Sequence, residues 1–322
     1  MGSHFLRIVL SDWAFWGGAS SRPHALRRWA DRFIIQHRRA ECTSFVPEKG
    51  TAPPDRIRHG KDRGLDLLRE MSYNGMEHRA LQLPADSSAG DTVYEDRRLQ
   101  MRFSAEEGKR RITCHFDRFC DGKPFDCDIV LDQPKMDSMV IATPWDKDRH
   151  FYYNQKINCM RASGIMEYDG RRYTFDPATD FGTLDWGRGV WTYDNTWYWG
   201  SGNADIGGNA FGFNLGYGFG NTRAATENIL FYNGKAHKLD DVTFHIPESG
   251  YMDPWRITSS DSRFEMDFQP ILDRAAKLDF KLLVSDQHQV FGRMSGTAVL
   301  DDGTPITVRD MVCFAEKVHN RY

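Results

Sequence analysis

Hydrophobic and polar residues alternate along most of the chain after Asp91. The alternation is clear in residues 111–116 (Arg-Ile-Thr-Cys-His-Phe) and 264–268 (Phe-Glu-Met-Asp-Phe). A period of two predicts β-strands that bury one face of a sheet. The only helix that the pattern favours after Asp91 is a short one over residues 224–228.

Turn signals separate these strand-like segments. Asp121-Gly122, Asp169-Gly170, Asn233-Gly234 and Asp302-Gly303 each lie between two of them. Asn-Gly and Asp-Gly supply the positive φ angles of tight hairpin turns. Because the pattern lacks long helical crossovers, we expect an antiparallel meander and an all-β fold rather than a βαβ fold.

The first 90 residues follow a different pattern. Pro23 to Arg39 and Gly64 to Met71 are expected to be helical, and the prolines at positions 47, 53 and 54 predict a loop between them. This part of the chain is therefore expected to differ from the strand-rich remainder.

The clearest strand covers Ala210 to Gly220. Its aromatic residues and Leu215 share one face, whereas alanine, glycine and asparagine occupy the other. A face of glycines lets another layer approach the backbone closely, or leaves room for a ligand. Trp197 and Trp199 share one face of the segment before it. Closing such a meander into a barrel removes exposed edges and can enclose a ligand cavity.

Composition narrows the class of protein. Of the 322 residues, 40% are hydrophobic and 13% aromatic, which suits a sizeable core and the walls of an apolar pocket. The formal net charge of −3 argues against nucleic acid as a partner. No apolar run approaches the roughly 20 residues of a membrane helix, and no signal peptide is evident. The six cysteines are expected to be free thiols of a cytoplasmic protein.

Several longer motifs carry a resemblance to a known family. They are residues 151–158, 181–191, 211–221, 225–228 and 285–292. Together they resemble the family catalogued as domain of unknown function 2804 (DUF2804). The resemblance runs from about residue 91 to the C-terminus, whereas the first 90 residues match poorly and show only a weak similarity at residues 28–33.

More distantly, the arrangement is similar to the lipocalin-like superfamily that includes the carotenoid 1,2-hydratases. The paired Tyr152-Tyr153 precedes the Asp185–Trp191 segment, as in those relatives. The resemblance implies two consecutive β-rich units, a sandwich-like first domain and a lipocalin-like antiparallel barrel. Residues 1–90 would form a divergent N-terminal segment of the first domain, 91–180 the rest of it, and 181–322 the C-terminal domain. Relatives often place His after the Asp, where this chain has Trp186, so hydratase chemistry is not carried over.

Asp185 is the first candidate catalytic residue. It lies in a segment that also holds Arg188 and four tryptophans, Trp186, Trp191, Trp197 and Trp199. A carboxyl group among indole rings is desolvated, which favours its protonated form and makes it a candidate proton donor. Indole faces can also stabilise a carbocation. The alternative is that Asp185 pairs with Arg188 in a structural turn and that the tryptophans are core residues.

His288 is the second candidate. Alternation places Asp286 and His288 on one face of their strand, and Gln287 and Gln289 on the other. His288 is the best general base or hydrogen-bond donor in the chain. The alternative is a histidine that completes a structural hydrogen-bond network.

A polar face is formed by Asn154, Lys156 and Asn158. These residues either line the interior of a barrel or face water, and water is the interpretation that an antiparallel strand favours. Glu227 is similarly ambiguous. The candidate ligand-binding residues are Tyr153, Asn154, Trp186, Arg188, Trp191, Trp197, Trp199, Asn214, Glu227 and Gln289.

Two classes of function fit these residues. In the first, an aromatic-lined β pocket binds an apolar small molecule and transforms it by acid catalysis, through hydration, isomerisation or cyclisation. In the second, the pocket carries or senses a lipid without changing it; a glycan ligand is a third option. No cofactor or metal is expected, because the cysteines lack zinc spacing and residues 216–220 lack the spacing of a phosphate loop.

Overall fold

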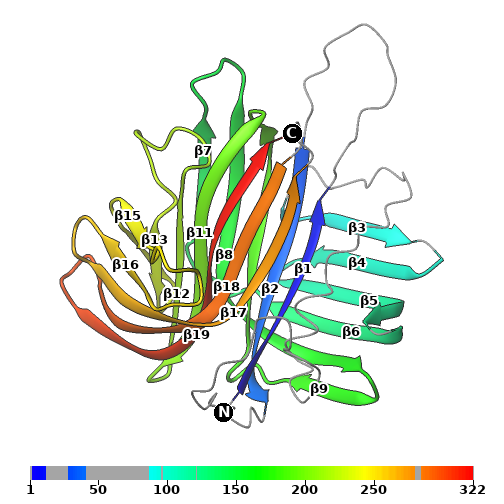
Figure 1. The fold of residues 1–322 in the computed structure, drawn as a ribbon. Coiled ribbons are helices and arrows are strands. Elements are labelled where there is room, and N and C mark those ends of the chain that lie inside the picture. Colours follow the sequence, from blue (N-terminus) through cyan, green and yellow to red (C-terminus); the bar gives the residue numbers. More distant parts are fainter. Residues whose placement is uncertain are drawn as a thin grey trace, which may run out of the picture.

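The protein is built from two antiparallel β-sheets (Figure 1). The computed structural model describes residues 2–11, 28–40, 87–95, 97–120, 122–279 and 284–321, and strands are the only regular secondary structure in these ranges. The all-β fold predicted from the alternating pattern is therefore confirmed. None of the described residues belongs to a helix that could cross a membrane.

The first sheet has ten strands in the described ranges. Its main path is β1-β2-β10-β8-β6-β5-β4-β3, and β7 and β9 also pair with β8. β8 is the longest strand of this sheet, so it can pair with four neighbours along its length. The strands are β1 (Gly2–Ser11), β2 (Arg28–Ala40), β3 (Gly90–Glu95), β4 (Leu99–Glu106), β5 (Lys109–Cys120), β6 (Lys123–Asp132), β7 (Met139–Pro144), β8 (Phe151–Tyr168), β9 (Arg171–Phe175) and β10 (Phe181–Val190).

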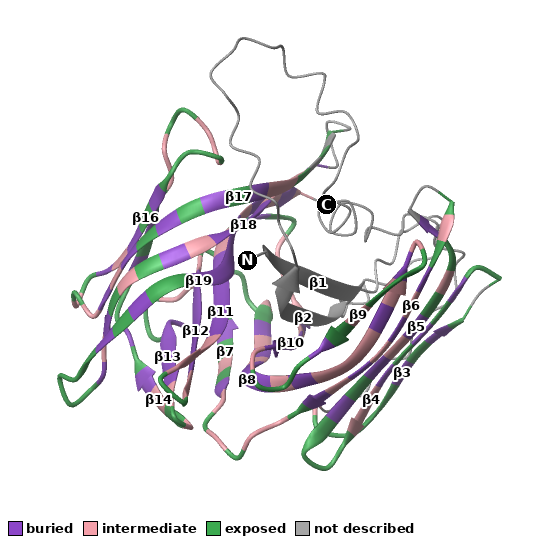
Figure 2. Cartoon of the chain, turned by 90° about the horizontal axis from the view of Figure 1, so that it is seen from below, coloured by how far each residue is buried: buried purple, intermediate pink, exposed green. Residues whose placement is uncertain are grey.

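The second sheet has nine strands in the described ranges. Their order is β14-β13-β12-β11-β19-β18-β17-β16-β15, and the long strands β17 to β19 curl into a half-barrel (Figure 2). The strands are β11 (Asp194–Ile206), β12 (Asn209–Tyr217), β13 (Ile229–Tyr232), β14 (Lys235–Lys238), β15 (Val242–His245), β16 (Trp255–Ser259), β17 (Phe264–Asp279), β18 (Val284–Val299) and β19 (Pro305–Arg321).

The predicted hairpin turns connect neighbouring strands. Asp169-Gly170 joins β8 to β9 and Asn233-Gly234 joins β13 to β14, with positive φ at all four residues. Gly122 lies between β5 and β6, and Asp302-Gly303 lies between β18 and β19. These turn residues therefore mark the positions of the hairpins, as the sequence predicted.

The helical expectations are wrong where the structure describes them. Residues 28–39 lie in β2, which pairs with β1 and β10, so pairing within the sheet overrides the local preference. Residues 224–228 connect β12 to β13 without forming a helix. Here the Asn228 side chain accepts from the Gly216 N–H and donates to the Asp240 carbonyl, which holds the connection against β12. Residues 23–27 and 64–71 lie outside the described residues.

The sheets change between Val190, the end of β10, and Asp194, the start of β11. β10 therefore pairs within the first sheet, although the predicted C-terminal domain begins at residue 181. A change of sheet does not by itself define a domain boundary, so the predicted domain boundaries stay a prediction.

The two sheets meet along β8 and β10 of the first and β11 and β12 of the second. The glycine face of β12 allows this close approach: a Cβ at Gly212 would lie 2.8 Å from Cys159 Sγ. Polar side chains also join the sheets. The Asn158 amide donates to Ser201 Oγ, Asn203 Oδ1 and the Phe213 carbonyl at 3.0–3.1 Å. The opposite faces of the sheets carry separate hydrophobic cores.

Four of the cysteines lie in the described side chains, and all four are buried free thiols: Cys114, Cys127, Cys159 and Cys313. Burial raises the pKa of Cys159 to about 12. Cys42 and the side chain of Cys120 lie outside the described part of the chain.

Candidate functional site

The polar face of β8 is buried at the junction of the sheets. Asn154 and Asn158 are fully buried, and Lys156 is 3% exposed. The prediction that this face meets water is wrong, because β11 and β12 pack against it. Buried polar groups need partners, so the question is what each of these side chains contacts.

Lys156 and Asp185 form a buried ion pair. They are register neighbours on β8 and β10, and Lys156 Nζ lies 2.5 Å from Asp185 Oδ1. Glu227 Oε2 lies 3.8 Å from the same ammonium group. On the other side of β10, the register neighbour of Asp185 is Arg32 of β2. The expected structural pair of Asp185 with Arg188 is therefore replaced by a pair with Lys156.

Trp199 of β11 completes the surroundings of Lys156. The ammonium nitrogen lies 4.3 Å from the centre of the indole ring, a cation–π contact. Trp199 Nε1 donates to Asn214 Oδ1 at 2.8 Å, and the Asn214 amide donates to Glu227 Oε2 at 3.2 Å. This chain of hydrogen bonds fixes Glu227 beside Lys156.

Gly216 makes room for the Glu227 carboxylate. A Cβ at this position of β12 would lie 2.5 Å from Glu227 Cδ. The close packing expected of the glycine face is thus present at Gly212, whereas the space at Gly216 is filled by the Glu227 side chain of the chain itself; room for a ligand on this face stays a prediction.

A cluster of aromatic rings borders the ion pair. The Tyr152 hydroxyl donates to Asp185 Oδ1 at 3.4 Å. The Tyr152 ring makes edge-to-face contacts with Trp191 and Phe219, at centroid distances of 5.9 and 4.9 Å. Phe219 also contacts Trp145 and Trp197. We call Trp145, Tyr152, Trp191 and Trp197 the aromatic box around Phe219.

Glu316 is a second buried carboxyl group near Trp199. It is the register neighbour of Trp199 on β19 and is 1% exposed. It accepts from Trp197 Nε1 at 3.1 Å and from Gln289 Nε2 at 2.8 Å. Trp197, Trp199 and Gln289, three of the predicted ligand-binding residues, therefore lie together on the face of the second sheet that meets the first.

Three other predicted residues lie on the opposite face of the first sheet. The Arg188 guanidinium lies 5.7 Å from the Tyr153 ring centre and 5.9 Å from the Trp186 ring centre, and the two rings contact each other edge to face. Trp186 belongs to the core of that sheet. Because side chains alternate along β10, Asp185 and Trp186 point to opposite faces. The carboxyl group is therefore not beside the indole that follows it in sequence.

His288 also lies away from Asp185. It belongs to the face of β18 opposite to Gln289, where it stacks on Tyr251 at 3.7 Å and its Nδ1 lies 2.7 Å from Asp273 Oδ2. Burial raises the pKa of Asp273, an effect that the hydrogen bond from His288 opposes. Asp286 shares the face of His288, as the alternation predicted. The two candidate catalytic residues are thus not brought into one site.

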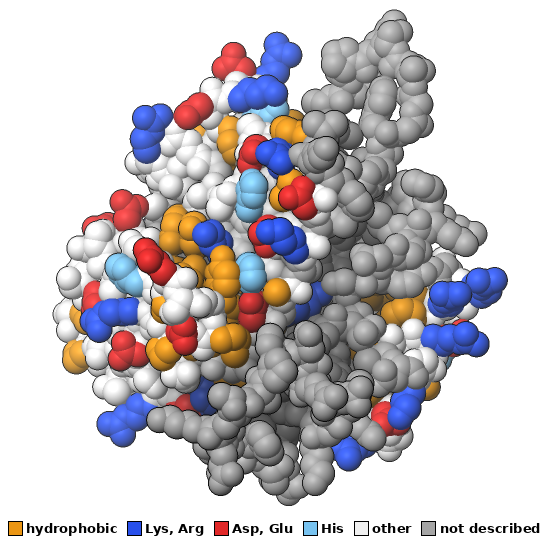
Figure 3. All heavy atoms as spheres, in the orientation of Figure 1, with side chains coloured by type: hydrophobic (Ala, Val, Ile, Leu, Met, Phe, Trp, Pro, Cys, Tyr) orange, Lys and Arg blue, Asp and Glu red, His pale blue; other side chains and the backbone are white. Residues whose placement is uncertain are grey.

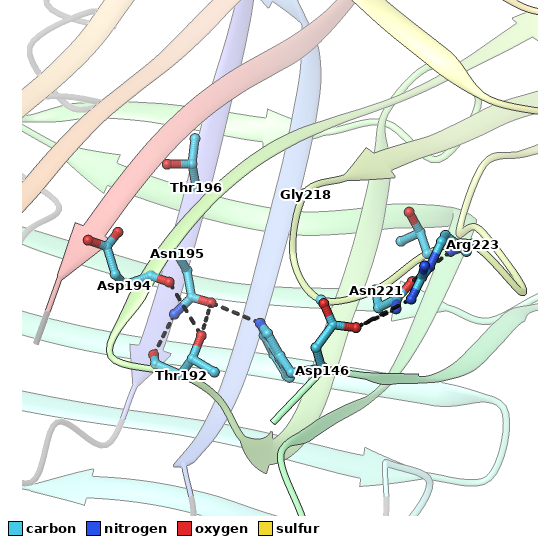
Figure 4. A pocket seen from close by; sticks show the side chains of 11 residues that line it. Asp146, Thr192, Asp194, Asn195, Thr196, Gly218, Asn221 and Arg223 are labelled. Carbon is cyan, nitrogen blue, oxygen red and sulfur yellow. Dashed lines mark hydrogen bonds and ion pairs between the residues drawn. The ribbon is translucent and has the colours of Figure 1, made fainter. Parts of the chain in front are cut away.

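An open hollow lies at one end of the junction, beside the aromatic box (Figure 4). Its volume is about 480 Å³. Polar side chains dominate its wall, and Asn221 and Arg223 both reach Asp146 there. Trp145, Gly218 and Gly220 also line it. The described residues contain no cluster of three or more His, Cys, Asp and Glu side chains suited to a metal ion.

The sequence reasoning missed Glu316, Phe219, Trp145 and the burial of Lys156. Two of these left a signal. Glu316 directly follows the apolar run Val312–Ala315, and by alternation it shares a face with Val312 and Phe314, although charged residues are rarely buried without a partner. Lys156 lies between two asparagines of the same face. The alternation places Phe219 on the aromatic face of a strand over residues 210–220, but β12 ends at Tyr217 and Phe219 lies in the connection that follows, so its contacts differ from those that the alternation predicts.

In a comparison with known protein families, one family model matches the chain. The model of a domain of unknown function (DUF2804) matches residues 66–322, which confirms the resemblance found in the motifs. No curated protein matches the chain.

Three solved structures are similar in outline. Kievitone hydratase from Nectria haematococca is 9% identical, with 93% of this chain and 81% of that chain covered and a TM-score of 0.42. A putative AttH from Nitrosomonas europaea is 14% identical, with 90% and 87% covered and a TM-score of 0.42. CghA with Sch210972 is 8% identical, with 99% and 88% covered and a TM-score of 0.41. Likeness at this level transfers neither a substrate nor a mechanism.

Proposed function

The chain belongs to the DUF2804 family, a domain of unknown function, and we propose that it binds an apolar small molecule between its two sheets and moves a proton on that molecule with Lys156 and Asp185. The observation that carries the proposal is the ion pair of these two residues, which is almost fully buried at 3% and 4% exposure.

A buried ion pair contributes little to stability. Removing two charges from water costs several kcal/mol per ion, and well-packed apolar residues often serve the fold equally well. Buried titratable groups with specific charged partners are more typical of functional sites. The site lies where two sheets meet, and apolar side chains of the second sheet adjoin it: Trp197, Trp199, Leu272, Phe291, Val312 and Phe314.

The pair suits proton transfer next to a carbonyl group. An ammonium group at 2.5 Å favours the ionised carboxylate, so Asp185 acts first as a base rather than as the proton donor expected from sequence. It takes a proton from the carbon beside the carbonyl; the C–H electron pair forms the C=C bond of an enolate, and the π pair of the C=O bond moves to the oxygen. Lys156 donates a hydrogen bond to that oxygen as its charge develops. Asp185 then returns the proton to a different carbon of a conjugated enolate, or to the opposite face of the same carbon, so that the product is an isomer of the substrate.

This cycle consumes no co-reactant and leaves both residues unchanged. Of hydration, isomerisation and cyclisation, it favours isomerisation, or cyclisation through an enol. Hydration of an alkene would need a proton donor at this position, whereas a carboxylate that is ion-paired with Lys156 carries no proton to donate.

The alternative function is a carrier or sensor that retains an apolar molecule unchanged. The aromatic box and the apolar cluster around Trp199 favour it, because they bind through burial alone. A glycan ligand is the weaker alternative, since the tryptophans of the junction are largely enclosed rather than presented as open platforms.

One experiment separates these functions. Small molecules that co-purify with the protein are extracted, identified by mass spectrometry and incubated with fresh protein. We expect conversion to an isomer of the same mass, and we expect Asp185→Asn to abolish it. Unchanged retention by the folded wild-type protein would favour the carrier, and a product heavier by one water would favour hydration.

A further inference from the structure

Phe219 lies at the centre of the aromatic box and, unlike Tyr152 of β8 and Trp197 of β11, does not belong to a strand. It lies in the connection between β12 and β13, and its ring centre lies 4.9–5.6 Å from those of Trp145, Tyr152, Trp191 and Trp197. All four contacts are edge to face, the arrangement that aromatic rings prefer. The box is thus shaped to hold one phenyl-sized ring, and at present the chain supplies that ring itself.

The box connects the open hollow with the ion pair. On one side, Trp145 and the two neighbours of Phe219, Gly218 and Gly220, line the hollow (Figure 4). On the other side, Tyr152 donates its hydroxyl hydrogen bond to Asp185. A molecule that entered from the hollow would therefore meet the place of the Phe219 ring before it met Lys156 and Asp185.

The residues that flank Phe219 are both glycines in backbone conformations that other residues rarely adopt. Gly218 and Gly220 have φ angles of +87° and +95°, in the region that favours glycine. Their backbones are packed closely, since a Cβ at Gly218 would lie 2.5 Å from the Thr196 carbonyl oxygen. The side chain of Phe219 between them is only half-buried.

Asn154 supplies a second, independent observation. It is fully buried on the face of β8 between Tyr152 and Lys156, and neither its amide oxygen nor its amide nitrogen has a hydrogen-bond partner among the described residues. An amide buried without partners is unfavourable. A ligand with a carbonyl group accepts from the amide nitrogen, and a neighbouring hydroxyl or N–H group donates to the amide oxygen.

We propose that Phe219 occupies the binding place of an aromatic ring of the ligand, and that Asn154 binds the polar, carbonyl-bearing part of the same ligand. This inference rests on the proposed function for the identity of the reacting group. It adds the chemical class of the ligand, which is an aryl carbonyl compound.

Acetophenone, a phenyl ring with an enolisable carbonyl, is the probe for the ring. The wild-type protein must displace its own ring before it binds, so its apparent affinity is reduced by the fraction that is open. If that fraction is about one tenth or less, Phe219→Ala binds acetophenone about tenfold more tightly or better by calorimetry. The matched control is Phe264→Ala, which removes a fully buried phenyl ring from the core on the far face of the second sheet. Equal affinity of Phe219→Ala and wild-type protein would overturn the assignment of the box.

The role of Asn154 is tested in the Phe219→Ala background. Asn154→Leu keeps the size of the side chain and removes its hydrogen bonds. It should weaken acetophenone about fivefold to tenfold and leave benzene, which lacks the carbonyl, unchanged. An equal effect on both probes, or on neither, would show that Asn154 does not bind the carbonyl.

A measurement on the wild-type protein covers the case in which Phe219→Ala does not fold. With fluorotryptophan incorporated, acetophenone should shift the ¹⁹F resonances of Trp145, Trp191 and Trp197. It should not shift that of Trp255, which is buried in the far core. Shifts confined to Trp255, or none at saturating acetophenone, would overturn the proposal. These readouts measure binding alone, so they can fail while proton transfer by Asp185 stands, and they can succeed while it fails.

Discussion

At the residue scale, the site depends on one cation held between two carboxylates. Lys156 Nζ lies 2.5 Å from Asp185 and 3.8 Å from Glu227, with the ring of Trp199 4.3 Å away. Among the described residues, Asp185 also accepts from the Tyr152 hydroxyl, whereas Glu227 accepts from the Asn214 amide. Both carboxylates thus lie beside the same ammonium group, but different neighbours orient each of them.

The ion pair is tested by a double-mutant cycle. Asp185→Asn and Lys156→Met each leave a buried charge without this partner, which costs about 3–5 kcal/mol of unfolding free energy. Glu227 stays beside Lys156 in Asp185→Asn, so the loss of unfolding free energy in this variant should lie at the lower end of that range. The double variant should lose about 1–3 kcal/mol less than the sum, because the two residues interact directly. Urea unfolding provides the three values, and strict additivity would mean that the pair is not formed in solution.

At the element scale, β12 uses its glycine face in two different ways. Near its centre, Gly212 faces Cys159 Sγ and Asn203 Oδ1, and Asn203 Oδ1 is already held by the Cys159 N–H. Near its end, Gly216 faces the carboxylate of Glu227, the far end of a flexible side chain. Neither glycine has a positive φ, so alanine can adopt both backbone conformations.

The same substitution should therefore have opposite effects at these two positions. Gly212→Ala overpacks the junction and should lower the unfolding free energy by about 1–3 kcal/mol, while the folded fraction keeps its turnover. Gly216→Ala should change the unfolding free energy by less than about 1 kcal/mol but displace Glu227 from Lys156 and lower turnover. Thermal melts and turnover of the co-purifying molecule give both quantities. If the two variants lost stability equally, the division of β12 into a packing half and a functional half would be wrong.

At the scale of the whole molecule, the site exists because two sheets share one polar interface. The Asn203 amide donates to Thr183 Oγ1 at 2.8 Å, and Arg161 pairs with Asp205 at 2.8 Å, each across the junction. These contacts bring β8 and β10 against β11 and β12 with a fixed spacing. Space-filling atoms show charged side chains of both signs scattered over the outer face in view (Figure 3), in contrast to the ion pair enclosed at the junction.

The sequence could predict what depends on local pattern. Alternation and turn residues gave the strands, the hairpins at Asp169-Gly170 and Asn233-Gly234, and the two-sided character of β12. The pairing of β2 with β10 could not be predicted, because it joins residues about 150 positions apart in a register that no local signal fixes.

The same limit applies to the candidate site. Alternation showed that Asn154, Lys156 and Asn158 share a face, but which face of a strand is buried depends on the second sheet. The structural alternative for Asp185 therefore names Arg188, which is near in sequence, whereas Lys156 is the partner that is near in space. Trp197, Trp199, Asn214, Glu227 and Gln289 all lie at the junction; Tyr153, Trp186 and Arg188 do not.

The most direct test of the central claim is deuterium exchange at carbon. The co-purifying molecule, or acetophenone where nothing co-purifies, is incubated in D₂O with wild-type protein, Asp185→Asn or His288→Gln, and the exchanged protons are counted by NMR. The wild-type protein should catalyse exchange, and Asp185→Asn, checked to be folded, should lower the rate by about 10²–10⁴-fold. His288→Gln should exchange at the wild-type rate, because His288 lies on the far face of β18. A folded Asp185→Asn that exchanges as fast as wild-type protein would contradict the account.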